Sequence, residues 1–426
     1  MDERTENNLP AFTATGAEKL TALLMYIAAY IYTLCSVSDN KRLWFGVFVL
    51  LFVLMVEYID RGVPRPKESW IWLGCLLLIT FCVCIGRGWP AYGESGSPEY
   101  SILAVHILAV WWVLSRSGKL AAGESGRLLP LDALNGFIRI PFGNFFLRLR
   151  CLGQGIKDLT RGKGRGRSTV FGVAAAIILG ALLLWWSVSS LSSADSGFAE
   201  LTGGILAMFS LEPGERFREF AVRFVLSLPV AAWLFGLIAG SVRMAPEKLR
   251  AQREGTESLL RKICIVPAGM WIAVTAVFAA VYLVFFAVQA SYLFGAFARR
   301  LPEGFIVSEY ARRGFFELCR VIVINFTLLW LVTRTSAKPV RGSCAAMVMC
   351  TLLLAAGMLF AVVSISKLVL YISCFGFTPK RLQSSWLAML MLCGCVCAAY
   401  SLWTGKKSFR FWMVFGAVTM AVLNLF

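Results

Sequence analysis

The side chains best suited to chemistry in this chain gather between residues 308 and 320, where polar residues recur at helical spacing. The members of this polar stripe are Tyr310, Arg313, Glu317 and Arg320, which are three, four and three residues apart. A helix places positions with this spacing on one face. Glu309 precedes Arg313 by four residues, so the charges alternate in sign. We expect either a charged recess for an ionic ligand or a ladder of ion pairs that joins two helices.

Basic side chains near the stripe favour an anionic ligand. Arg312 and Arg313 carry guanidinium groups, which bind a carboxylate or a phosphate through paired hydrogen bonds. Lys367 lies within another apolar run, and its most economical partner is Glu317 or Asp195. The alternative is a lysine that extends from the helix end towards the lipid headgroups.

Several catalytic and metal-binding chemistries lack the residues they need. The single histidine, His106, excludes a multi-histidine metal site and a Ser–His–Asp triad. The cysteines at 82 and 84, and those at 393, 395 and 397, are two residues apart and diverge on a helix, which disfavours a zinc site. The basic run 161–169 lacks the residue order of a nucleotide phosphate loop. We therefore predict no catalytic residue, metal or cofactor, and favour a protein that is not an enzyme.

The composition requires a solvent other than water for most of the chain. Hydrophobic residues make up 58% of the 426 residues and charged residues only 15%, which is far more apolar surface than one soluble core can enclose. The net charge of +18 resides in the gaps between apolar runs. This placement indicates contact with lipid headgroups and disfavours nucleic acid as a partner.

Apolar windows long enough to span a bilayer recur along the sequence. They predict an all-α fold, a polytopic transmembrane helix bundle of about eleven spans. The predicted spans are 20–37, 43–60, 70–86, 100–115, 170–191, 220–242, 265–294, 315–333, 343–372, 384–403 and 409–426.

The distribution of lysine and arginine predicts the orientation of these spans. With the N-terminus inside, the segments predicted to be cytoplasmic hold most of the 42 basic residues, as the positive-inside rule requires. The outer loop 295–314 still carries four basic residues, which weakens this assignment. We expect a bacterial cytoplasmic membrane protein with a cytoplasmic N-terminus and an extracytoplasmic C-terminus.

The linker 116–169 separates an N-terminal four-helix membrane region, 1–115, from a seven-helix membrane region, 170–426. Within the linker, aromatic and aliphatic residues alternate with Arg139, Arg148 and Arg150. A basic amphipathic segment of this kind lies in the plane of the headgroups. The expected partners are therefore the lipid bilayer, anionic lipid headgroups at the linker, and a possible partner subunit in the membrane.

Three stretches of the sequence, 191–198, 289–318 and 371–382, resemble a family of bacterial multi-pass membrane proteins of unknown function, number 4173, and its relative number 4153. The resemblance covers roughly residues 130–420, and its middle stretch contains the polar stripe. It implies membrane architecture and a bacterial origin, but no reaction, substrate or catalytic residue.

The predicted orientation places all three stretches on the outer side of the membrane. We therefore predict one extracytoplasmic ligand site, in which the last two residues lie deeper than the others. The predicted members are Asp195, Tyr310, Arg312, Arg313, Glu317, Arg381, Arg320 and Lys367.

Three functions are compatible with these observations. The first is a membrane protein that binds, transports or senses a small polar or anionic ligand. The second is a membrane-embedded enzyme on a lipid-linked or phosphorylated substrate, with Glu317 or Asp195 as the general base. Pairing to arginine lowers the pKa of a carboxylate and makes it a poor base, so this hypothesis ranks lower. The third is a structural or assembly subunit, in which the ion pairs serve only helix packing.

Overall fold

The computed structural model describes residues 12–35, 41–86, 99–126, 128–160, 215–294 and 307–425, together with positions 180 and 187. Within these residues the secondary structure is helical, apart from an isolated bridge between Val266 and Ser336. Every predicted span except 170–191, which lies almost entirely outside the described residues, coincides with a helix. These helices are α1 (Gly16–Leu34), α2 (Lys41–Ile59), α3 (Lys67–Cys84), α4 (Glu99–Arg116), α10 (Glu215–Arg243), α12 (Ala268–Phe294), α13 (Val307–Thr335), α14 (Cys344–Phe375), α15 (Pro379–Thr404) and α16 (Phe409–Leu423).

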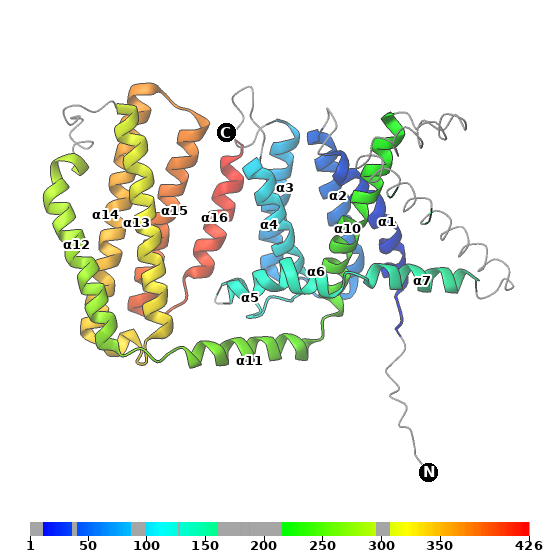
Figure 1. Cartoon of the computed structure of the whole chain (residues 1–426), viewed down its shortest axis with the longest axis horizontal. Coiled ribbons are helices and arrows are strands. Elements are labelled where there is room, and N and C mark those ends of the chain that lie inside the picture. Colours follow the sequence, from blue (N-terminus) through cyan, green and yellow to red (C-terminus); the bar gives the residue numbers. More distant parts are fainter. Residues whose placement is uncertain are drawn as a thin grey trace, which may run out of the picture. The chain divides into compact units, whose positions relative to one another are not determined.

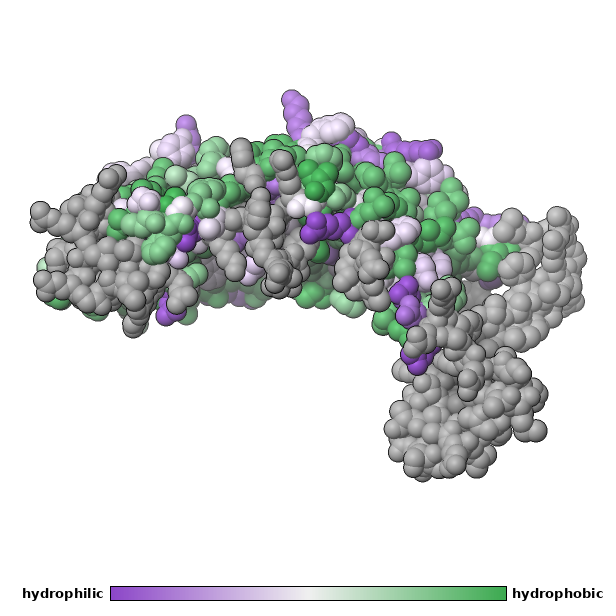
Figure 2. Space-filling view, turned by 90° about the horizontal axis from the view of Figure 1, so that it is seen from above, coloured by the Kyte–Doolittle hydropathy of each residue, from purple (hydrophilic) through white to green (hydrophobic). Residues whose placement is uncertain are grey.

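The described helices confirm an all-α membrane architecture. Seven of them are long and apolar enough to cross a membrane, and α4 and α16 provide shorter apolar helices. The helix α12 leaves Val277, Leu283 and Val288 more than 60% exposed, and apolar residues cover much of the surface seen in Figure 2. Exposed apolar surface on this scale is stable against lipid hydrocarbon but not against water.

The described part of the chain forms two compact units. In the first unit, α1 packs against both α2 and α10. Two short helices, α6 (Ile140–Gly143) and α7 (Leu147–Thr160), lie across the ends of α1 and α10 (Figure 1). A Cβ atom at Gly236 of α10 would lie 2.5 Å from the carbonyl oxygen of Pro141. The close approach of α6 to α10 therefore requires glycine at this position.

The second unit contains α3, α4 and α12–α16, together with α5 (Leu129–Leu134) and α11 (Pro246–Lys262). Helix α14 packs against α12, α13 and α15, whereas α16 packs against α3 and α15. A buried polar contact crosses the apolar core, where the Tyr282 hydroxyl donates to Asn325 Oδ1 at 2.7 Å. Asn325 Nδ2 in turn donates to the Leu353 carbonyl at 3.4 Å. These bonds link α12, α13 and α14, as polar side chains do between membrane helices.

Several segments that connect the predicted spans come together at one end of the second unit. Arg341 Nε donates to the Leu402 carbonyl at 3.1 Å, and Lys119 Nζ donates to the Met244 carbonyl at 2.7 Å. Arg410, at the start of α16, pairs with Glu68 at the start of α3. We call this the basic end of the unit. At the opposite end, the Ser101 hydroxyl on α4 donates to Asn424, just after α16.

The contact at Gly236 generates a prediction about stability. We expect Gly236→Ala to lower the free energy of unfolding by about 1–3 kcal/mol, because the added methyl group displaces the α6 backbone. The matched control is Gly153→Ala on α7, where a Cβ atom would meet nothing within 4 Å. Thermal unfolding of both variants in detergent micelles tests this expectation, and equal midpoints would contradict it.

Candidate functional site

The predicted extracytoplasmic site falls only partly on described residues. Asp195 lies outside them. The backbone of Tyr310, Arg312 and Arg313 belongs to the first two turns of α13, and Glu317 and Arg320 follow in the same helix. The helical spacing of the polar stripe is thus present in the backbone. Helix α13 begins eight residues before the predicted span 315–333, because the hydropathy pattern excludes its charged first turns.

The structure brings Glu317 and Lys367 within electrostatic range of each other. Lys367 is fully buried on α14, and its neighbour Leu368 belongs to a small apolar cluster with Phe315 and Cys319 of α13. Glu317 and Arg320 are exposed on α13. Of the two partners predicted for Lys367, Glu317 is the one within electrostatic range among the described residues. A buried lysine within range of a carboxylate on a neighbouring helix is the strongest chemical feature among the predicted site residues.

Arg381 has a local role in the structure. Its Nη1 donates to the carbonyl of Phe375 at 2.7 Å and to that of Gly376. The guanidinium also lies 4.1 Å from the centre of the Tyr371 ring. These contacts satisfy carbonyl groups at the end of α14, where the helix itself supplies no donor. Arg381 therefore stabilises the turn between α14 and α15.

A buried carboxylate at the basic end escaped the sequence analysis. Glu68 is 5% exposed and accepts hydrogen bonds from Trp72 Nε1 at 2.9 Å and from the Ser125 amide at 3.3 Å. Arg410 Nη2 lies 3.1 Å from its second oxygen. Trp111 donates to the Ser125 hydroxyl at 2.7 Å. These bonds attach the loop after α4 to the starts of α3 and α16.

A second buried carboxylate, Asp132 on α5, faces the same loop. Its Oδ1 accepts the Ala121 amide at 2.7 Å, and Asp132 and Asn135 are both fully buried. Asn135 Nδ2 donates to Gln252 of α11 at 3.0 Å. Asp132 Oδ2 and Asn135 Oδ1 accept no hydrogen bond from any residue that the structure describes. Such unsatisfied buried oxygens are rare and costly.

The model of one protein family matches residues 96–426, from just before α4 to the last residue. Its description is "Domain of unknown function (DUF4153)". The chain belongs to the DUF4153 family. The match includes the polar stripe, Lys367 and the Asp132 loop, whereas α1–α3 precede it. No curated protein and no solved structure matches this DUF4153 chain.

No metal cluster adjoins the predicted site in the described part of this DUF4153 protein. The described residues contain no group of three or more histidine, cysteine, aspartate or glutamate side chains placed to hold a metal ion. A groove of about 500 Å³ runs between α1 and α10 in the first unit. Arg223, which pairs with Glu219 at 3.0 Å, lines this groove. None of the residues that line it is a predicted site residue.

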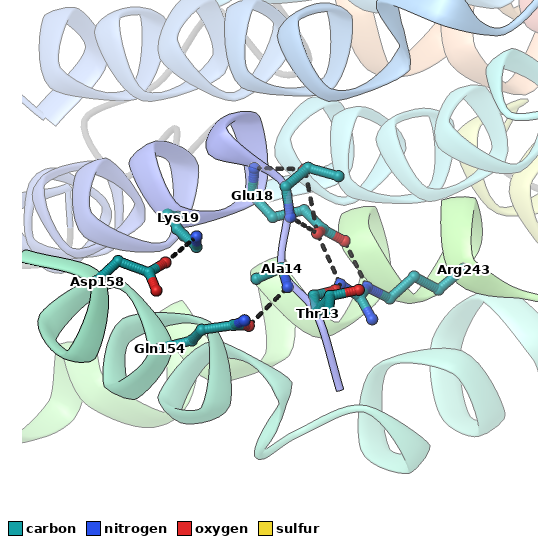
Figure 3. Close-up of polar contacts among 8 residues, drawn as sticks. Thr13, Ala14, Glu18, Lys19, Gln154, Asp158 and Arg243 are labelled. Atoms are coloured by element: carbon teal, nitrogen blue, oxygen red, sulfur yellow. Dashed lines mark hydrogen bonds and ion pairs between the residues drawn. The ribbon is translucent and has the colours of Figure 1, made fainter. Parts of the chain in front are cut away.

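The N-terminal segment of the DUF4153 protein is tied to the first unit by a polar network (Figure 3). Glu18 accepts from Arg243 Nη2 at 2.7 Å, and it also closes a capping box with Thr15 at the start of α1. The Ala14 amide donates to the Gln154 side chain at 2.6 Å. An ion pair between Lys19 and Asp158 joins α1 to α7. The sequence offers one signal for this network, because Thr15 and Glu18 are three residues apart, as in a capping box.

The charge state of Asp132 depends on its surroundings. Burial, together with the negative charge of Glu68, raises the pKa of the Asp132 carboxyl from 3.8 to about 6, although the Ala121 amide opposes the shift. The folded protein thus holds this proton more tightly than the unfolded chain does. The neutral carboxyl favours folding, and this contribution is lost as the pH rises from about 4 to about 6.

We expect Asp132→Asn to raise the free energy of unfolding at about pH 8 by up to about 3 kcal/mol, since the amide cannot ionise. At about pH 4 the variant and the wild type unfold alike. The measurement is the thermal unfolding midpoint across this pH range. Glu254→Gln, at an exposed carboxylate on α11, serves as the control and keeps the wild-type pH profile. If Asp132→Asn loses as much stability between pH 4 and pH 6 as the wild type does, Asp132 is not the group whose ionisation causes the loss.

Proposed function

We propose that this protein binds or transfers a small anionic ligand at the end of the second unit opposite the basic end, where α13 and α14 carry Glu317, Arg320 and Lys367. The observation that carries the proposal is the burial of Lys367 within an apolar helix. An ionisable group in a membrane helix is expensive to insert and usually marks a ligand, ion or proton pathway.

The charges at this end favour an anion over a cation. Four basic residues, Arg312, Arg313 and Arg320 of α13 and Lys367 of α14, outnumber the two acidic residues of this end of α13, Glu309 and Glu317. A single carboxylate can hold Lys367 in its charged form while the ligand is absent. An arriving carboxylate or phosphate then competes with Glu317 for the lysine.

We further propose that the basic end faces the cytoplasm of a bacterial cell, so that the ligand site opens to the extracytoplasmic side. The support is the concentration of lysine and arginine in the loops 116–136, 244–264, 334–342 and 404–410, which meet at one end of the second unit. Basic loops resist translocation across the cytoplasmic membrane.

Two native cysteines at opposite ends of α14 test this orientation. Cys344 and Cys374 are both exposed, and a variant that retains only one of them reports on one side. On intact cells, a membrane-impermeant thiol reagent should label the Cys374-only variant at once, and the Cys344-only variant only after permeabilisation. The reverse pattern would overturn the orientation and place the ligand site on the cytoplasmic side.

Removal of the buried charge separates a ligand site from a structural ion pair. We expect Lys367→Met to leave the unfolding midpoint unchanged or higher, because the variant no longer buries an ammonium group and the Glu317 that remains is exposed. Inorganic phosphate and citrate, the two anion probes, should raise the midpoint of the wild type but not of this variant. The exposed Lys338→Met is the matched control and should keep the anion response.

A scaffold role predicts the opposite result. If Lys367 serves only to join α13 to α14, Lys367→Met lowers the unfolding midpoint, because the electrostatic attachment to Glu317 is lost. The exchanged pair, Lys367→Glu with Glu317→Lys, then restores the stability. Neither variant alters an anion response in that case, and the ligand proposal fails.

A further inference from the structure

Helix α7 of the first unit packs against α1 and α10 at the level where α1 begins and α10 ends (Figure 1). On its inner face, Arg148 Nε donates to the Ala22 carbonyl of α1 at 2.9 Å, and Cys151 is fully buried. The network of Figure 3 adds Gln154 and Asp158 to these attachments. Since α1 and α10 are apolar helices, their ends mark the depth of the lipid headgroups.

The outer face of α6 and α7 carries large apolar side chains that no described residue covers. Phe142 and Phe146 are 58% and 65% exposed, and Leu149 is 60% exposed. Ile156 continues this row, since residues seven apart lie within about 20° of each other around a helix. A row of this kind is stable when it lies against lipid chains.

A basic row runs beside the apolar row on the same helix. Arg150 and Lys157 are both exposed and also seven residues apart. Arg150 directly follows Leu149, and Lys157 directly follows Ile156. Consecutive residues are about 100° apart around a helix, so the basic row lies about 100° from the apolar row. The apolar row can therefore face the hydrocarbon while the basic row faces the phosphate layer.

The polar helix α11 gives an internal comparison. It is equally exposed and has no buried residue, but acidic residues alternate with its basic ones, and Arg253 pairs with Glu257 at 3.2 Å. It has no row of exposed aromatic residues. Of these two segments, the outer face of α6 and α7 is the one that combines exposed aromatic side chains with cations.

We propose that the outer face of α6 and α7 is a docking surface for anionic phospholipids. The acyl chains contact Phe142, Phe146, Leu149 and Ile156, and the headgroup phosphate lies between Arg150 and Lys157. Two observations favour lipid as the partner. The apolar and basic rows point in different directions, as the hydrocarbon and phosphate layers of a bilayer require, and the cations complement the negative charge of anionic headgroups.

Lipid retention by the full chain tests the proposal. The protein is placed in nanodiscs of phosphatidylcholine with added phosphatidylglycerol, and bound lipids are counted by native mass spectrometry over a titration of phosphatidylglycerol. We expect Arg150→Gln with Lys157→Gln to weaken phosphatidylglycerol binding about 25-fold, since each basic side chain near an anionic surface contributes about fivefold. The variant Arg150→Lys, which preserves the charge, should bind phosphatidylglycerol as the wild type does.

The control removes the same number of charges elsewhere. Lys248→Gln with Arg250→Gln on α11 should leave phosphatidylglycerol binding unchanged, and phosphatidylcholine binding should be the same in all variants. Equal losses from the α7 and α11 pairs would overturn the proposal, because they would reflect only the net charge of the protein. No loss from the α7 pair would also overturn it and would indicate that another protein covers this face.

Discussion

The hydrogen-bonding requirement of the backbone in lipid governs the rest of this structure. Amide and carbonyl groups in hydrocarbon must find partners within the chain, which leaves helices as the secondary structure of every described span. Hydrogen-bonding side chains then concentrate where helices end. Glu68, Asp132 and Glu18 all lie in first turns or short helices at such ends, where each accepts backbone or side-chain donors.

The few polar groups left inside the bundle are correspondingly specific. Tyr282 and Asn325 satisfy each other across two helices, and the bond from Asn325 to the Leu353 carbonyl extends the link to a third. Lys367 differs from them because it is an ionisable group, and the carboxylate within its electrostatic range, Glu317 of α13, is exposed. A neutral hydrogen-bonded pair would join the helices at lower cost, so packing alone is a weak reason for a lysine at this position.

The hydropathy of the sequence predicts the long helices well, because about twenty apolar residues in succession have few other stable conformations. It underestimates helices with charged first turns, as at α13, where the pattern begins at 315 although the helix begins at Val307. It also misses α5, α6, α7 and α11, which are short or polar and owe their positions to tertiary contacts such as those of Arg148 and Gln252.

The candidate site shows the same division. Spacing along one helix predicted the stripe on α13. Economy of charge predicted Glu317 or Asp195 as the partner of Lys367, and Glu317 lies within its electrostatic range. The burial of Glu68 and Asp132 could not be predicted, because it depends on a loop whose path is set by contacts between distant segments. In the sequence these residues belong to segments that resemble ordinary hydrophilic linkers.

The length of α14 has a consequence for the environment of Lys367. A helix of 32 residues is about 48 Å long, whereas the hydrocarbon core of a bilayer is about 30 Å thick. If the helix enters the core near its first residue, the far boundary of the core falls within about one turn of Lys367. Hydrophobic mismatch thus becomes a variable for this protein: a thicker bilayer immerses the lysine in hydrocarbon, and a thinner one releases it to the headgroups.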